Sequence, residues 1–200
     1  MEVGRTEMDD PQVIWAMGLG RSGSHWLAWL LGDALNSPVA GPNDAPKHWA
    51  PDGGDRPGPY LVRHINIEPP DDEPIILIVR DPRDVMVSQM QYWHHPFERR
   101  WDSIVRWGEY NREFCKRAAA VVRYEDLHAD CAGALKKALD TAGLEYNESG
   151  LERACWQQRF EAKKEWQSEG RFVPSNFFYK GQVGAWKEEL TPEQAQKIKR

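Results

Sequence analysis

The chain of 200 residues carries 31 Asp and Glu against 26 Lys and Arg, a net charge of −5, and 40% hydrophobic residues. This composition is typical of one globular domain and differs from that of a disordered chain. An acidic balance argues against a nucleic-acid partner, because domains that bind nucleic acid carry a basic face. No 18-residue apolar run or signal segment is found, so we expect no membrane span and a cytoplasmic protein.

Residues 1–11 are predicted to form a flexible tail and residues 12–200 one domain. An apolar run at 13–18 predicts a central parallel strand, and a helix over 24–35 should follow it after a turn. Pro and Gly recur through residues 36–59 and exclude long regular structure there. Loops of this length are usually functional, so we interpret residues 36–59 as a loop on the substrate side of the site.

The later elements alternate in type. Strands are predicted over 60–65, 74–79 and 119–123, and helices over 84–93, 98–117, 133–142 and 151–166. In the longest helix, one face should contain Trp101, Ile104, Val105 and Gly108. The alternation predicts an α/β fold, a single three-layer domain with a mostly parallel central sheet flanked by helices.

The three cysteines, Cys115, Cys131 and Cys155, are odd in number and form no C-x-x-C pair. Neither a disulfide framework nor a zinc site is indicated, and a reducing compartment fits best. The adjacent His94 and His95 lack accompanying carboxylates, so we expect no metal. The oligomeric state stays open between a monomer and a homodimer.

The turn Gly18-Leu-Gly-Arg-Ser-Gly-Ser24 has the shape of a phosphate cradle. Glycine-containing loops let backbone N–H groups approach an anion, and the N-terminus of the next helix adds partial positive charge. The loop lacks the G-x-x-x-x-G-K-[ST] pattern that holds ATP or GTP phosphates with magnesium. Arg21 can instead bind a phosphate or sulfate. A glycine turn with an incidental arginine is the alternative interpretation of this segment alone.

Two later segments carry related chemistry. The apolar run 74–79 leads into Arg80 and, eight residues on, Ser88, which can converge on a second phosphate. Ligands of open α/β sheets bind at the carboxyl ends of strands, where Arg80 is expected. The alternative is a surface ion pair between Arg80 and Asp84 at the helix start.

Near the C-terminus, Lys180 provides an ammonium beside Gly181, whose backbone can approach an anion closely. Thr191 and Pro192 are typical of a helix start, as N-cap and first helical residue.

Together these segments resemble the motifs of the sulfotransferases that use 3′-phosphoadenosine 5′-phosphosulfate (PAPS), a family with a P-loop-NTPase-like fold. The 5′-phosphosulfate loop P-K-S-G-T-T-W is matched by G-R-S-G-S-H-W, and the 3′-phosphate motif R-x-P-x-D-x-x-V-S by residues 80–88. The segment R-K-G-x-x-G-D-W-K is matched by Y-K-G-Q-V-G-A-W-K, and residues 122–127 are similar to the family's strand ending in Y-E-D. The matches keep the family's order from residue 13 to residue 191.

The resemblance implies a role for each matching residue. Backbone N–H groups of Ser22, Gly23 and Ser24 would hold the 5′-phosphosulfate, and Arg21 would replace the family's lysine beside the bridging oxygen. His25 is a further cofactor-binding candidate in the same loop, at the position where many members have a threonine whose hydroxyl contacts the 5′-phosphate.

The rest of the nucleotide would be bound by the other motifs. Trp26 would stack on adenine and Tyr124 would contact it, while the 3′-phosphate would be held by Arg80, Ser88, Lys180 and Gly181. Two departures, Tyr179 for arginine and Ala185 for aspartate, remove residues that the family has in the third segment.

Sulfuryl transfer also needs a general base, and a histidine suits this role. The family's catalytic histidine ends a short strand before the 3′-phosphate motif, a position that His64 fits. Glu68 is the nearby alternative, and His25 and His48 are weaker ones.

The resemblance therefore implies an enzyme that transfers a sulfuryl group from PAPS to a hydroxyl or amine by in-line displacement, releasing PAP without a metal. A nucleotide or small-molecule kinase using Mg-ATP and a non-catalytic adenosine-bisphosphate-binding protein are the alternatives. Aromatic residues near the site suit sugars, phenols and sterol-like rings alike: Trp49, Tyr92, Trp93 and Phe97. We expect a carbohydrate or another small hydroxylated acceptor.

Overall fold

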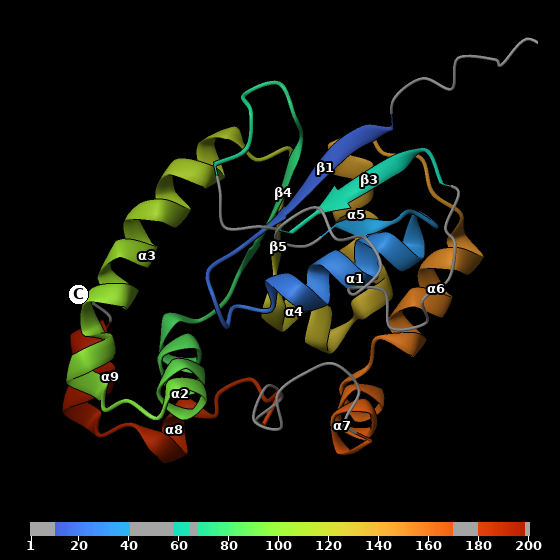
Figure 1. Ribbon diagram of the computed structural model, residues 1–200. Coiled ribbons are helices and arrows are strands. Elements are labelled where there is room, and N and C mark those ends of the chain that lie inside the picture. The colour runs from blue at the N-terminus through green and yellow to red at the C-terminus, as the bar shows by residue number, and fades with distance from the viewer. Residues whose placement is uncertain (1–10, 41–57, 65–67, 170–179, 199–200) are drawn as a thin grey trace, which may run out of the picture.

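The computed structural model describes residues 11–40, 58–64, 68–169 and 180–198 (Figure 1). Of the predicted tail over 1–11 only Pro11 is described, and residues 41–57 of the predicted loop over 36–59 lie outside the described residues, as do His48 and Trp49.

The described strands form a parallel sheet in the order β2-β3-β1-β4-β5. Their bounds are β1 (Gln12–Met17), β2 (Val39–Ala40), β3 (Tyr60–Arg63), β4 (Ile75–Val79) and β5 (Ala120–Arg123). The central strands β1 and β4 are buried from Ile14 to Met17 and from Ile75 to Ile78, because a parallel sheet is covered by helices on both faces. The predictions of a central strand at 13–18 and of an α/β fold are confirmed.

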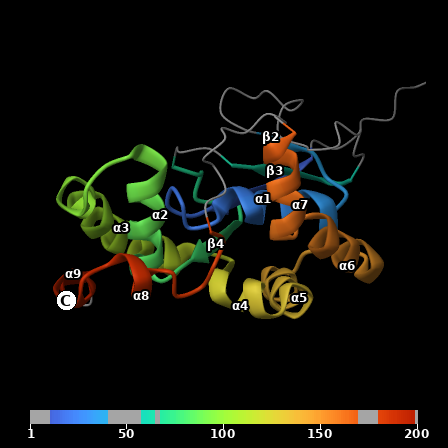
Figure 2. The same cartoon turned by 90° about the horizontal axis from the view of Figure 1, so that it is seen from below.

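The helices lie on both sides of this sheet. Their bounds are α1 (Ser24–Ala34), α2 (Pro82–Trp93), α3 (Phe97–Arg117), α4 (Tyr124–Ala129), α5 (Cys131–Ala142), α6 (Glu148–Gln157), α7 (Phe160–Ser168), α8 (Trp186–Glu189) and α9 (Pro192–Ile198). One face packs its apolar side chains against α1, α5 and α6, and Phe114 of α3 packs against the other face beside Trp15 and Leu77. Figure 2 shows α2, α3, α8 and α9 on one side and α4–α7 on the other.

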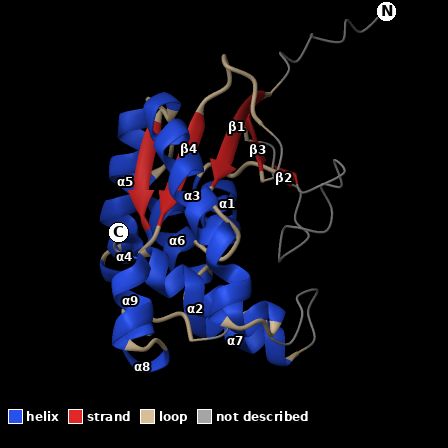
Figure 3. Cartoon of the chain, turned by 90° about the vertical axis from the view of Figure 1, so that its left-hand side faces the viewer, coloured by secondary structure: helices blue, strands red, loops and turns tan. Residues whose placement is uncertain are grey.

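The strand order places the ends of β1 and β4 at a switch point. From β1 the chain runs to β2 and β3 on one side of β1, then crosses to β4 on its other side. Ligands of open α/β sheets bind outside the carboxyl ends of strands at such a point. In Figure 3 the strand arrows point toward the end of the molecule where α2, α7 and α8 lie.

Helix ends follow local sequence. Asp81 is the N-cap of α2, where its side chain accepts a hydrogen bond from the Arg83 N–H, and Pro82 takes the first helical position. Before α9, the Thr191 Oγ1 accepts a bond from the Gln194 N–H and the Gln194 side chain accepts one from the Thr191 N–H. The predicted helix start at Thr191 and Pro192 is confirmed.

The helix predicted over 151–166 is wrong in one respect, because Gln158 and Arg159 separate α6 from α7. The Gln158 side-chain amide donates a hydrogen bond to the carboxylate of Asp33 in α1. Its carbonyl oxygen accepts a hydrogen bond from the Lys163 ammonium. All three side chains are buried. This chain of polar contacts turns the backbone where the local sequence favours a continuous helix.

In α3, the predicted face is wrong at Val105, which is exposed, whereas Ile104 and Trp107 are buried. Positions 97, 104, 107 and 114 form the buried stripe of this helix, at the spacing that brings residues to one side.

The cysteine interpretation is also wrong, because Cys131 and Cys155 form a disulfide, which leaves Cys115 free and exposed. The bond joins the first residue of α5 to α6. Disulfides persist in oxidising surroundings, so the cysteines no longer support a reducing compartment.

We expect the double variant Cys131→Ser with Cys155→Ser to lose about 3 kcal/mol of unfolding free energy, because the bond closes a loop with a sequence separation of 24. Urea denaturation measures the loss, and Cys115→Ser is the matched control. Equal urea midpoints for the wild type and the double variant would contradict this stabilising role.

Candidate functional site

A cavity of about 310 Å³ lies at the switch point, between the loop after β1, the start of α2, the segment before α8, and the junction of α6 and α7. The residues predicted from the sequence that line it are Arg21, Gly23, Ser24, His25, Trp26, Arg80, Ser88, Tyr124, Lys180 and Gly181. These residues come from segments that are far apart in the chain, and the fold gathers them at one place.

Ser22 does not line this cavity. Its backbone N–H donates to the Leu19 carbonyl at 2.9 Å, inside the turn, and its Oγ is buried with no hydrogen-bond partner among the described residues. The N–H group that the resemblance assigns to the 5′-phosphosulfate is therefore used within the loop in this structure.

Gly23 is required by the geometry of the loop. Its φ of 101° lies in the left-handed region, and a Cβ there would meet the Tyr124 ring at 2.8 Å. The following residues Ser24 and His25 begin α1 and line the cavity, so the N-terminus of an 11-residue helix faces it. This arrangement favours an anion.

Arg21 is held in an unusual backbone conformation, with φ 80°. Its Nε donates to the Ser88 Oγ at 3.2 Å, and its guanidinium lies 4.5 Å from the centre of the Tyr92 ring. Burial lowers the pKa of Arg21 to about 10, so the side chain is still a cation at neutral pH.

Arg80 contacts the loop after β1, the segment before α8 and the first residue of α4. Its Nη1 donates to the Arg21 carbonyl at 3.3 Å and its Nη2 to the Gln182 carbonyl at 3.1 Å. The guanidinium lies 4.0 Å from the centre of the Tyr124 ring, and its Nε is buried with no partner in the described part of the chain. Arg80 thus joins the loop after β1 to the segment before α8.

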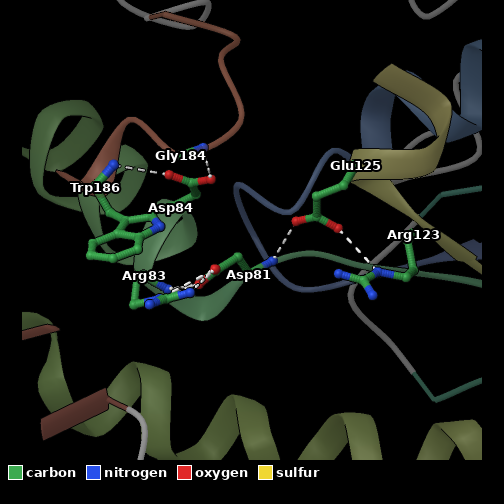
Figure 4. A network of polar contacts seen from close by, with 7 residues as sticks. All are labelled: Asp81, Arg83, Asp84, Arg123, Glu125, Gly184 and Trp186. Carbon is green, nitrogen blue, oxygen red and sulfur yellow. Dashed lines mark hydrogen bonds and ion pairs between the residues drawn. The ribbon is translucent and has the colours of Figure 1, made fainter. Parts of the chain in front are cut away.

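Asp84 fastens the same segment to α2 (Figure 4). Its carboxylate accepts hydrogen bonds from the Gly184 N–H at 2.7 Å and the Trp186 N–H at 3.0 Å, and only 2% of the residue is exposed. The alternative of a surface ion pair between Asp84 and Arg80 is therefore wrong. Its role is to anchor backbone, which sequence reasoning missed because both partners lie about 100 residues further along the chain.

Around Asp84, further polar contacts hold the start of α2. The Asp81 carboxylate pairs with Arg83, whose guanidinium stacks 3.8 Å from the Trp186 ring centre. The Asp81 N–H donates to the Glu125 carboxylate, which also pairs with Arg123 (Figure 4). Glu125 lies in the segment similar to Y-E-D, which begins α4 and does not end a strand.

The third segment is shaped by Gly181. Its φ is 62°, and a Cβ there would lie 2.3 Å from the Phe160 ring. The Tyr124 hydroxyl donates to its carbonyl at 3.2 Å. The neighbouring Lys180 pairs with Glu188 at 3.0 Å and Glu189 at 2.7 Å, and these hydrogen bonds raise the pKa of the ammonium. Tyr179 lies outside the described residues.

One aromatic group in the wall was not predicted. Phe160, the first residue of α7, lines the cavity with Trp26 and Tyr124, whose rings are 5.4 Å apart in an edge-to-face arrangement. The local sequence predicts a continuous helix through Phe160, because no turn residue marks the break. Other lining residues that it missed come from α4 and the α6–α7 junction: Leu127, His128, Gln158, Arg159 and Lys163.

The predicted base, His64, follows β3 directly, is 8% exposed and is not among the residues that line the cavity. Its ring centre lies 4.1 Å from that of His25, which itself lines the cavity. Burial lowers the pKa of His64 to about 4. Burial, then His64, then Arg21 lower the pKa of His25 well below its ordinary value. Both imidazoles are therefore neutral at pH 7.

The alternative base Glu68 has a different setting. Its carboxylate pairs with Arg117 at 3.6 Å and its side chain is 81% exposed, away from the lining of the cavity. Tyr92 and Trp93 at the end of α2 pack edge to face at 5.1 Å and are not among the lining residues either, although Tyr92 contacts Arg21.

A family model described as the sulfotransferase domain matches residues 71–200. The chain belongs to the sulfotransferase domain family. Sulfotransferase 6B1 of Danio rerio is 26% identical in an alignment of 145 residues, and the match covers 62% of this chain and 49% of that protein. The chain thus spans about half the length of this curated relative. None of the described helices combines the length and apolar character needed to cross a membrane.

Solved structures share the fold. Mouse sulfotransferase SULT7A1 complexed with PAP matches with a TM-score of 0.67 and 21% identity, over 94% of this chain and 82% of that one. Retinol dehydratase with androsterone and PAP matches with a TM-score of 0.59 and 15% identity, over 94% and 78% of the two chains. The predicted resemblance to sulfotransferases and the predicted fold class are confirmed.

We expect Asp84→Ala to lower the unfolding free energy by about 3 kcal/mol, because two buried N–H groups lose a charged acceptor. Urea denaturation measures the loss, and amide exchange should speed up at Gly184 and Trp186. Asp126→Ala, which removes an exposed carboxylate from α4, is the control. If both variants unfold at the same urea concentration, the anchoring role of Asp84 is wrong.

Proposed function

We propose that the protein transfers a sulfuryl group from PAPS to a hydroxyl or amine of a small-molecule or carbohydrate acceptor. One observation carries this proposal: the segments that resemble the 5′-phosphosulfate loop and the 3′-phosphate motif line one cavity, where Arg80 bonds to the Arg21 carbonyl. The family membership supports it, and PAP is present in the mouse sulfotransferase structure that shares the fold.

The lining of the cavity fits such a nucleotide. Trp26, Tyr124 and Phe160 provide aromatic surface for an adenine, and Arg21 and Arg80 provide cations for its two anionic ends. The buried Arg80 Nε and Trp26 Nε1 have no partner among the described residues, which fits polar atoms that a ligand satisfies.

The proposed reaction is an in-line displacement at sulfur. The acceptor oxygen or nitrogen forms a bond to sulfur while the bond from sulfur to the 5′-phosphate oxygen breaks, and negative charge develops on that oxygen. Arg21 and the N-terminus of α1 would stabilise this charge. His64 would take the acceptor proton, since a neutral imidazole is a competent base.

For the acceptor, the aromatic pair Tyr92 and Trp93 near Arg21 favours a ring-bearing molecule. Retinol dehydratase, which shares the fold, holds androsterone or retinol in its structures. We propose a small hydroxylated acceptor, with a carbohydrate as one form of it. The cytoplasmic location, the lack of a metal and the choice between monomer and homodimer stay predictions.

Calorimetric titration separates this proposal from its alternatives. A PAPS enzyme should bind PAP more tightly than AMP, which lacks the 3′-phosphate, and more tightly than Mg-ATP. Tightest binding of Mg-ATP would favour the kinase and reject the proposal. PAP binding without turnover of PAPS across an acceptor library would instead favour the non-catalytic alternative.

We expect Arg80→Ala to weaken PAP binding by about 2–3 kcal/mol, because it removes a charge-assisted contact to the 3′-phosphate. Binding of AMP should change much less. Calorimetry with both nucleotides measures the difference.

Arg83→Ala is the matched control, since Arg83 lies in the same motif but pairs with Asp81 outside the cavity. If Arg80→Ala weakens the binding of PAP and of AMP equally, Arg80 does not contact the 3′-phosphate.

We expect His64→Ala to reduce turnover by ~10²–10⁴ with little change in PAP affinity, as for loss of a general base. Because the pKa of His64 is lowered to about 4, its basic form is nearly complete from about pH 6, so the wild-type rate should be flat from there to neutrality. Steady-state rates against pH test both points. Glu68→Gln should be neutral, and a comparable loss in that variant would transfer the base role to Glu68.

A further inference from the structure

The contact between His25 and His64 is absent from the motif that the loop resembles, where threonine is common at the first of these positions. His25 belongs to the first turn of α1 and lines the cavity, while His64 lies behind it at the end of β3. Their ring centres are 4.1 Å apart with the planes at 50°. The His25 side chain therefore contacts both the cavity proposed to bind PAPS and the proposed base, His64.

We propose that His25 is a positioning residue for the base: its ring packs against the His64 imidazole and excludes water from it, so that His64 stays neutral and ready to accept a proton. The inference rests on the proposed function. It assigns His25 a role that a threonine at this position lacks, because threonine has no ring to cover His64.

The surroundings hold His25 in this place. Its ring meets the Trp29 ring edge to face at 6.1 Å, and Trp29 is 1% exposed. On Trp29 lies the ammonium of Lys163, 4.0 Å from the ring centre. The indole thus forms a fixed wall for His25 on the side of α1.

The protonation of the pair depends on its burial and on the charged groups near it. The cations that face it from the described elements are Arg21 in the loop after β1 and Lys163 of α7, across Trp29. Burial lowers the pKa of both imidazoles and Arg21 lowers that of His25 further, whereas a backbone hydrogen bond at His64 acts in the opposite direction. The backbone N–H of His64 donates a hydrogen bond to the Ala40 carbonyl at 3.0 Å, which holds the residue at the end of β3.

Two substitutions separate the ring of His25 from its nitrogens. His25→Thr removes the ring and lets water reach His64, so the pKa of His64 should rise from about 4 to above about 5.5, nearer its ordinary value. His25→Phe keeps an aromatic ring over His64, and its pKa should stay low. The acid limb of the turnover profile should move with the pKa in each case.

The experiment is a histidine NMR titration of the full-length chain, with His64→Gln to assign the His64 signal and thermal melts to confirm folding. It needs no acceptor, so it reports on the contact even if PAPS is not the donor. Calorimetry with PAP on the same samples tests the proposed function independently.

The expected result is a raised His64 pKa in His25→Thr alone, with PAP affinity within about 5-fold of wild type in both variants. Identical His64 titrations in the wild type and His25→Thr would overturn the inference. So would a rise of the His64 pKa in His25→Phe as large as that in His25→Thr, because the aromatic ring would then not be what keeps the pKa of His64 low.

Discussion

The site depends on one guanidinium that has three partners. Arg80 donates to the Arg21 and Gln182 carbonyls and stacks on Tyr124, so it joins the loop after β1, the segment before α8 and the start of α4. No described carboxylate pairs with it, because Asp81 is bound to Arg83 and Asp84 to backbone N–H groups. The acids next to Arg80 thus stabilise the scaffold and leave the cation's charge to act on the cavity.

The two sides of the site differ in electrostatic character. Arg21 remains charged beside the Arg80 guanidinium, whereas burial keeps His25 and His64 neutral. Such a division suits a reaction in which a phosphate oxygen gains negative charge while an acceptor loses a proton, since each event needs a different kind of group. The fold achieves it by placing the cations at the switch point and the imidazoles where α1 meets β3.

The features that could be predicted from the sequence are those that depend on residues close together in the chain. The apolar runs predicted β1 and β4, and the motifs named residues that line one cavity. The features that could not be predicted are contacts between segments far apart in the chain. The break before Phe160 depends on Asp33, which lies 125 residues before Gln158 in the chain. The disulfide depends on α5 packing against α6, and the anchoring by Asp84 on the segment before α8. Nothing in the spacing of cysteines, glutamines or aspartates marks these contacts.

Arg21 has a backbone geometry that glycine adopts more readily, since φ values near 80° are uncommon for other residues and cost of order 1–3 kcal/mol. The contacts to Arg80, Ser88 and Tyr92 hold it there. Selection for thermostability alone would accordingly drive this position toward a residue without a side chain. Under the proposed function the cation at this position serves the phosphosulfate group, so we expect stability and activity to oppose each other at Arg21.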